Sequence, residues 1–206
     1  MLLYVVTDRR WLDGAPLETA VEQALLGGAT FLQLREKALP DEAFLAEALT
    51  LKTLAKKYEV PLVINDNIDV AIKADADGVH VGQSDMIDTD VRARIGPDKI
   101  LGISANTVEN AIIAEKRGAD YIGVGAVFGT TTKEDAQNIT IEMLRKICDA
   151  VSIPVVAIGG INETNILALS GSGIDGVAVI SAIFSKPDIC AATKRLKTLS
   201  ATVTGR

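Results

Sequence analysis

Eight short runs of Val, Ile, Leu and Ala alternate along the chain with longer segments that have helical periodicity. The runs lie at residues 2–7, 30–34, 62–65, 78–81, 100–104, 121–125, 155–158 and 176–179. This alternation is typical of βαβ units on a parallel sheet. Eight units in 206 residues leave about 26 residues for each, enough for a strand, a helix and two short loops. The pattern therefore predicts an α/β fold, a (β/α)8 TIM barrel that occupies residues 1–206 as a single domain.

The segments between these runs carry the start and stop signals of helices. We expect helices at residues 16–26, 41–58, 107–117 and 140–151, with Asn106 or Thr107 capping the third and Thr140 the fourth. Small residues that lead from a helix into a strand recur at Ala29, Ala76, Ala119 and Ile174, at spacings of 47, 43 and 55 residues. Those spacings favour a four-fold βαβα duplication. An open doubly wound sheet is the alternative, but it predicts a glycine-rich fingerprint after the first strand, and residues 7–13 contain no glycine.

Composition and charge exclude several classes of protein. Hydrophobic residues make up 48% of the chain, aromatic residues only 4%, and the net charge is −6. Few aromatic side chains are present to stack on nucleic-acid bases, and a negative chain is repelled by nucleic acid and by anionic membranes. The first residues lack the pattern of a signal peptide, and no apolar stretch is long enough to span a membrane. We expect small-molecule substrates, no nucleic acid and no membrane; a homo-oligomer stays open.

The two cysteines, Cys148 and Cys190, lie far apart in the sequence and have no metal-ligand spacing. Buried thiols in a reducing compartment explain them better than a disulfide or a zinc site. The sequence therefore predicts a cytoplasmic protein.

In a barrel of this kind the active site lies at the carboxyl ends of the strands. The second run reaches Gln33, and Arg35 and Lys37 follow at alternate positions, so that all three side chains point to the same face. One interpretation is a solvated edge strand. The other is an inward row of cationic groups for a polyanion, which we favour because three long polar side chains make a poor apolar core.

Carboxylates follow the next two strands. Asp66 comes after Asn65 at the end of the third run, and Asp85 comes after the fourth. Asn and Asp are common turn residues, so residues 65–67 alone would also fit a simple turn. Beside a cationic row, however, two carboxylates on adjacent strand ends fit Mg²⁺, which proteins hold with one or two carboxylates and substrate phosphates. We therefore predict a Mg²⁺ site at Asp66 and Asp85.

The later strand ends carry groups that suit anions. The loop after the sixth run contains two glycines, three threonines and Lys133, and the seventh run leads into Gly159 and Gly160. Backbone N–H groups, hydroxyls and a cation are groups that bind an anion. The alternative is that the loop after the sixth run is a lid that does not contact the ligand. The eighth run leads into Ile180 and Ser181, and the loops after strands seven and eight form the common phosphate site of this fold.

His80 is the only histidine and falls within the fourth run. A general base could stand there, but a single histidine in an apolar strand is more often structural. No nucleophile is placed beside it to complete a catalytic triad, so a hydrolase is disfavoured.

Six motifs, taken in order, resemble the thiamine phosphate synthase family across nearly the whole chain. They are residues 33–37 (QLREK), Asn65 and Asp66, residues 80–85 (HVGQSD), residues 130–133 (TTTK), Gly159 and Gly160, and Ile180 and Ser181. The resemblance implies an enzyme of (β/α)8 fold, a transferase that joins a hydroxymethylpyrimidine diphosphate to a thiazole phosphate and releases diphosphate.

Carried over residue by residue, the resemblance also implies a role for each motif. The pyrimidine diphosphate would be held by Gln33, Leu34, Arg35, Glu36, Lys37, Asn65 and Lys133, and the pyrimidine would contact Ser104. The thiazole phosphate would be held by Thr130, Thr131, Thr132, Gly160, Ile180 and Ser181. With Mg²⁺ at Asp66 and Asp85, the cations Arg35, Lys37 and Lys133 would stabilise the departing diphosphate.

Two alternative functions also fit a barrel of this kind. A related thiazole tautomerase shares the fold and needs no Mg²⁺, and in that group a histidine follows the glycine that ends the sixth strand, where this chain has Ala126. A regulatory or phosphate-binding barrel without activity would leave Asp66 and Asp85 with no ion to hold.

Overall fold

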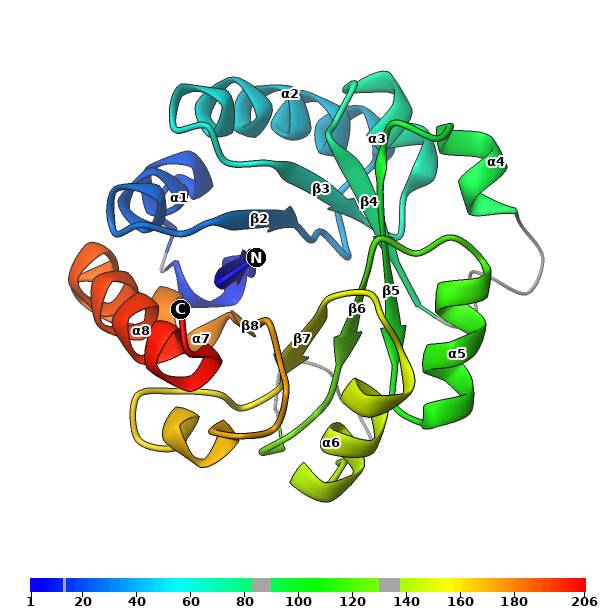
Figure 1. Ribbon diagram of the computed structural model, residues 1–206. Coiled ribbons are helices and arrows are strands. Elements are labelled where there is room, and N and C mark those ends of the chain that lie inside the picture. The colour runs from blue at the N-terminus through cyan, green and yellow to red at the C-terminus, as the bar shows by residue number, and fades with distance from the viewer. Residues whose placement is uncertain (13, 83–89, 130–137) are drawn as a thin grey trace.

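Eight parallel strands close into a barrel in the computed structural model, which describes residues 1–12, 14–82, 90–129 and 138–206. The strands follow one another in chain order, and the last pairs with the first (Figure 1). They are β1 (Leu3–Val6), β2 (Phe31–Leu34), β3 (Leu62–Asn65), β4 (Gly78–Val81), β5 (Ile100–Ala105), β6 (Tyr121–Val124), β7 (Val155–Ile158) and β8 (Gly176–Val179). The predicted (β/α)8 barrel is confirmed. A closed barrel has no edge, so the open doubly wound sheet and the solvated edge strand are both wrong.

Helices surround the barrel on its outside (Figure 1). Those in the described residues are α1 (Leu17–Leu26), α2 (Asp41–Lys57), α3 (Ile68–Lys73), α4 (Val91–Ile95), α5 (Val108–Lys116), α6 (Ile141–Ala150), α7 (Ser181–Phe184) and α8 (Ile189–Thr204). The expected helices correspond to α1, α2, α5 and α6. Short 3-10 helices, η1 (Arg9–Trp11) and η3 (Ile166–Leu169), follow β1 and β7, so the successive units differ in length.

Side-chain caps explain where two of these helices begin. Thr107 Oγ1 accepts a hydrogen bond of 3.1 Å from the backbone N–H of Asn110, and Thr140 Oγ1 accepts one of 3.1 Å from Met143. Each cap satisfies an N–H group that the first helical turn leaves without an intrahelical partner. Thr107, rather than Asn106, is therefore the N-cap of α5.

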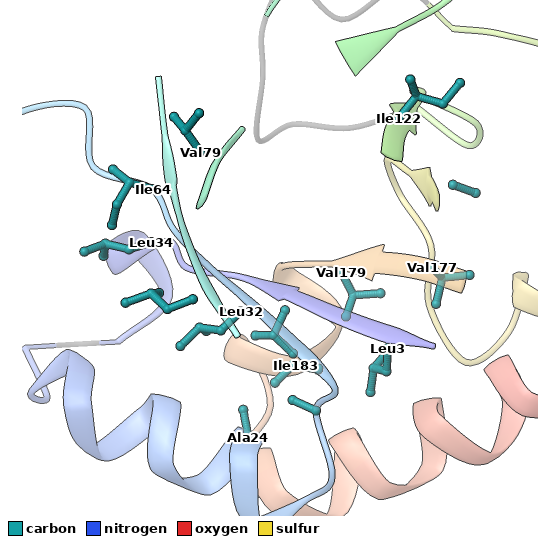
Figure 2. Packing of buried hydrophobic residues seen from close by; sticks show 14 of the residues in the cluster. Leu3, Ala24, Leu32, Leu34, Ile64, Val79, Ile122, Val177, Val179 and Ile183 are labelled. Atoms are coloured by element: carbon teal, nitrogen blue, oxygen red, sulfur yellow. The ribbon is translucent and has the colours of Figure 1, made fainter. Parts of the chain in front are cut away.

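The core has two layers, because strand side chains alternate between the two faces of the barrel wall. Outward residues such as Leu32, Val79 and Val177 pack in the layer between the strands and the helices (Figure 2). The inward residues form a separate cluster of Tyr4, Val6, Phe31, Val63, Tyr121, Val156 and Ala178. The outer layer is aliphatic and holds the helices in place, whereas the barrel interior contains aromatic rings.

The thiols are less buried than expected. Cys148 and Cys190 are both free, and both are partly buried rather than fully buried. In the parts of the chain that the structure describes, every helix is too short or too polar to cross a membrane.

Candidate active site

The register of the parallel strands decides which inward side chains adjoin one another. Gln33 of β2 is level with Val6 of β1 and Val63 of β3, and Asn65 of β3 is level with His80 of β4. Since all the strands run in the same direction, their carboxyl ends lie at one end of the barrel. The polar residues that follow β2, β3 and β5 therefore share that end.

Asp66 lies in the segment that joins β3 to α3, and it contacts two other candidate residues. Its Oδ1 accepts a hydrogen bond of 2.7 Å from Asn65 Nδ2, and its Oδ2 accepts one of 2.7 Å from Lys37 Nζ. The backbone of Asp66 has a left-handed φ of 61°, and its N–H donates to the carbonyl of His80. The next residue, Asn67, caps α3. Residues 65–67 therefore form a turn, as one interpretation of the sequence expects, and Asp66 also contacts a cation, as the other expects.

Arg35 is adjacent to a carboxylate that sequence reasoning did not select. Arg35 Nη1 lies 3.9 Å from Oδ2 of Asp8, a residue only 5% exposed in the segment after β1. Asp8 also accepts hydrogen bonds from the backbone N–H and the guanidinium of Arg10. Burial would raise the pKa of Asp8, but hydrogen bonds from Arg10 and the positive charges of Arg10 and Arg35 bring it below its ordinary value.

Leu34 and Glu36 point away from this cluster. The Leu34 side chain is fully buried in the layer between strands and helices (Figure 2). Glu36 accepts a hydrogen bond of 2.8 Å from Arg9, which also pairs with Glu47. Burial raises the pKa of Glu36, because the opposing effect of Arg9 is smaller and Glu47 adds to the rise. A role for Leu34 or Glu36 in binding would have to use backbone atoms.

Gln33 and Ser104 are joined through the barrel interior by three further side chains. Gln33 Nε2 donates to the hydroxyl of Tyr4, and that hydroxyl lies 2.7 Å from the hydroxyl of Tyr121. His80 then connects Tyr121, 2.9 Å from its Nδ1, to Ser104, 3.0 Å from its Nε2. The only histidine is thus a buried hydrogen-bonding residue that touches a candidate substrate contact.

The Gly159–Gly160 segment lies directly against the segment that follows β6. A Cβ on Gly160, which has a φ of 65°, would come within 2.1 Å of the carbonyl oxygen of Gly129. Only glycine therefore fits this close approach. The carbonyl of Gly160 accepts hydrogen bonds from the side chains of Asn162 and Asn165, at 3.1 and 2.9 Å, so the orientation of this peptide is fixed.

Ile180 and Ser181 come directly after β8. Ile180 is the N-cap residue of α7, and Ser181 is its first residue. Both side chains are partly buried. Gly160, Ile180 and Ser181 thus follow the adjacent strands β7 and β8, where the fold commonly binds phosphate.

Several candidate residues lie outside the described residues. They are Asp85, Thr130, Thr131, Thr132 and Lys133. The described chain stops beside them at Gly82 and Gly129.

Comparison with known proteins identifies the family. Residues 3–183 match the family model described as thiamine monophosphate synthase. The chain belongs to this family. The family is thus the one that the six sequence motifs resemble, and its curated relatives are thiamine-phosphate synthases, which are transferases of thiamine biosynthesis.

Individual relatives of the thiamine monophosphate synthase family agree over nearly the full length. The chain is 55% identical to the thiamine-phosphate synthase of Ruminiclostridium cellulolyticum over 194 residues, which cover 94% of this chain and 92% of the relative. It is 50% identical to the enzyme of Clostridium tetani, with 94% and 93% covered. The solved thiamine phosphate pyrophosphorylase from Pyrococcus furiosus superposes with a TM-score of 0.89 at 44% identity, covering 98% of this chain and 96% of that one. The protein is therefore an enzyme, a transferase.

The described residues of this family member fit a Mg²⁺ ion in part. Asp66 supplies the hard carboxylate oxygens that Mg²⁺ prefers, and the contact with Lys37 shows that the position accepts positive charge. Among the described residues, no group of three or more His, Cys, Asp or Glu side chains forms a metal cage. Mg²⁺ does not require one, because it commonly keeps several waters and takes its remaining ligands from one or two carboxylates and substrate phosphates.

Sequence reasoning missed Asp8, Tyr4 and Tyr121. Asp8 could be predicted from the sequence, because it is a carboxylate shortly after a strand, as Asp66 and Asp85 are. The two tyrosines look like core residues in the sequence. Their hydroxyl contacts depend on strands β1 and β6 facing each other across the barrel, which no local pattern specifies.

Proposed function

We propose that the protein joins a 4-amino-2-methyl-5-hydroxymethylpyrimidine diphosphate to a thiazole phosphate, and that the products are thiamine phosphate and diphosphate. With a carboxythiazole phosphate as the second substrate, carbon dioxide is released as a third product. The observation that carries the proposal is a pair of cation–carboxylate contacts at the carboxyl end of the barrel, Arg35 with Asp8 and Lys37 with Asp66, in a chain of this family. We place the reaction in the cytoplasm, because both cysteines are free thiols.

The reaction breaks the bond between the pyrimidine methylene carbon and the diphosphate oxygen, and the electron pair leaves with diphosphate. The methylene carbon then forms a bond to the thiazole nitrogen. Arg35 and Lys37, with Lys133, act on the charge that grows on the leaving group, which is where a positive group accelerates bond breaking most. The electron-rich aminopyrimidine carries the cation that remains, and the bound thiazole attacks at short range without a general base.

Mg²⁺ would be held by Asp66 together with Asp85, and when bound it neutralises charge on the diphosphate. Lys37 donates a hydrogen bond to Asp66 in the free protein, and this contact would hold the ammonium group beside the proposed diphosphate site. Asn65 donates to the other oxygen of the same carboxylate and orients it.

The thiazole phosphate would lie at the loops after β6, β7 and β8. The fixed peptide of Gly160 and the start of α7 at Ser181 support this position, since this part of a (β/α)8 barrel commonly binds phosphate. Thr130, Thr131 and Thr132 would supply hydroxyl groups from the preceding loop.

The tautomerase alternative has less support. Moving a proton on the thiazole requires an acid or base within about 3 Å of the reacting atom. Ala126 has no such group, and His80 uses both ring nitrogens in hydrogen bonds inside the barrel.

Asp66→Ala tests the proposal, with Asp69→Ala as a matched control. Asp69 is an exposed carboxylate in the first turn of α3, and its partner is Arg94 rather than Lys37. We expect Asp66→Ala to lower the rate of diphosphate release by about a hundredfold at limiting Mg²⁺, and to weaken binding of Mn²⁺ measured by electron paramagnetic resonance. Asp69→Ala should change neither. Wild-type rates and Mn²⁺ binding in Asp66→Ala would show that the metal assignment is wrong.

A further inference from the structure

The barrel interior contains a continuous chain of hydrogen-bonding side chains. It runs from Gln33 through Tyr4, Tyr121 and His80 to Ser104, and its steps between hydroxyl and ring atoms are 2.7, 2.9 and 3.0 Å. The first four residues are buried, with exposed fractions of 5%, 2%, 0% and 8%. The chain therefore crosses the barrel away from solvent and connects β2 to β5.

The backbone is built to make room for this chain. A Cβ on Gly102, an inward position of β5, would lie 2.2 Å from the ring of Tyr121 and 2.5 Å from Nδ1 of His80. The rings of Tyr4 and Tyr121 pack edge to face at 5.8 Å, and Phe31 packs against both. Packing thus holds each hydroxyl in line with the next group.

The orientation of the Gln33 amide, with Nε2 against Tyr4, sets the direction of the hydrogen bonds along these residues. Gln33 Nε2 has no lone pair to offer, so it donates to Tyr4. Tyr4 must then donate to Tyr121, since a buried hydroxyl proton without an acceptor is costly. Burial raises the pKa of both tyrosines well above the ordinary value, so both keep their protons.

The same direction continues through the histidine. Tyr121 donates to Nδ1 of His80, so the ring carries its proton on Nε2 and donates to Ser104 Oγ. A hydroxyl that accepts here acts as the donor in its next hydrogen bond. At the other end, the carbonyl oxygen of Gln33 can only accept. The two ends of the chain are thus an acceptor on β2 and a donor on β5.

This pair of ends matches one chemical pattern. The edge of an aminopyrimidine offers an amino group that donates and a ring nitrogen that accepts. The oxo analogue offers a carbonyl that accepts and a ring N–H that donates, which is the reverse. To bind the oxo analogue equally well, the amide of Gln33 would have to turn over, every hydroxyl would have to reverse, and His80 would have to change tautomer.

We propose that Tyr4, Tyr121 and His80 are positioning residues that hold Gln33 as an acceptor and Ser104 as a donor, and so select an aminopyrimidine diphosphate over its oxo analogue. This inference rests on the proposed function, because it takes Gln33 and Ser104 as contacts of the pyrimidine.

The tautomer of His80 tests the chain without any substrate. Since the chain has a single histidine, labelling with ¹⁵N-histidine gives signals from this ring alone. We expect a protonated Nε2 and an unprotonated Nδ1 in the unsubstituted protein at mildly alkaline pH. In Tyr121→Phe, Nδ1 loses its donor and its signal should shift. A ring protonated on Nδ1, or a spectrum that Tyr121→Phe leaves unchanged, would overturn the chain.

A comparison of the amino and oxo pyrimidine diphosphates as substrates tests whether the chain of hydrogen bonds selects the amino form. We expect the ratio of kcat/KM for the amino and oxo pyrimidine diphosphates to fall by roughly tenfold in Tyr121→Phe and equally in Tyr4→Phe. The double variant should lose no more than either single variant, because one break already uncouples the ends. Tyr58→Phe is the matched control, since it removes a hydroxyl bonded to Glu22 outside the barrel.

The outcomes separate this inference from the proposed function. Turnover in which both single variants keep the original ratio, or in which their effects add, overturns the inference and leaves the proposed function standing. If the unsubstituted protein releases diphosphate from neither pyrimidine, the proposed function and the pyrimidine selection are wrong together. If Tyr121→Phe does not fold, Tyr4→Phe carries the comparison alone, with circular dichroism as the check on folding.

Discussion

Asp8 lies where its charge can act on Arg35, a residue of the proposed diphosphate site. It is buried after β1, its pKa is below the ordinary value, and it lies 3.9 Å from the Arg35 guanidinium. A buried carboxylate in this position restricts the rotamers of Arg35 and balances its charge in the free protein. In the proposed function Asp8 would therefore position Arg35.

Asp8→Asn should lower kcat/KM for the pyrimidine diphosphate by roughly tenfold, because Arg35 loses its charged partner. Asparagine keeps an oxygen that can cap the backbone N–H of Arg10, so the local fold should survive. Steady-state kinetics measure the effect. Glu22→Gln, which removes a carboxylate paired with Lys57 on the outer surface, is the control and should leave kcat/KM unchanged. Equal kinetics in the two variants would show that Asp8 does not position Arg35.

The sequence predicts residues at strand ends better than it predicts contacts between strands. Lys37 and Asp66 could be selected because Asp66 directly follows β3 and Lys37 comes shortly after β2, and the structure brings them together. The contact of Asp8 with Arg35 depends on the pairing of Val6 with Gln33, a register that local patterns do not specify. The chain from Gln33 to Ser104 needs five strands in place at once.

At the scale of elements, strands and capped helices are predictable and the connections are less so. The predicted strand at residues 78–81 is the observed β4, because a buried parallel strand reads as a short apolar run. The α6 helix begins after Thr140 because the threonine caps it. Between β7 and β8, tertiary packing of the 3-10 helix η3 decides the conformation, and its four residues are too short to show a helical period.

Asp75 connects three elements, since it follows α3 and accepts hydrogen bonds from Lys52 of α2 and from Lys99, which precedes β5. Hydrogen bonds from these lysines lower the pKa of Asp75 to about 2. Its φ of 49° is left-handed, a conformation that asparagine also tolerates. The charge can therefore be removed without straining the backbone.

Asp75→Asn should lower the melting temperature at neutral pH and have little effect on kcat/KM. Because the folded pKa is below the unfolded value, the stabilisation is complete above pH ~4 and is lost as the pH falls toward ~2. Thermal melts followed by circular dichroism at several pH values measure this. Asp149→Asn, at an exposed position of α6, serves as the control. A difference from wild type that persists unchanged at pH ~2 would rule out the ion pairs as its cause.

At the scale of the whole molecule, closure of the barrel brings strand ends that are far apart in the sequence to one end of the structure. The chain carries a net charge of −6, yet Arg35 and Lys37 lie at the same end of the barrel as Asp66. In the proposed function, these two cations would attract a diphosphate to a chain that is negative overall. Membership of the thiamine monophosphate synthase family and the closed (β/α)8 topology agree with this arrangement.

In the proposed function this site couples two substrates and does not isomerise either one. A nuclear magnetic resonance time course on a single sample tests it most directly. The thiazole phosphate is first incubated with the protein alone, and the pyrimidine diphosphate and Mg²⁺ are then added. We expect no change in the first stage, and coupled product and diphosphate in equal amounts in the second. Protein-dependent isomerisation of the thiazole phosphate in the first stage, with no coupled product in the second, would contradict the account.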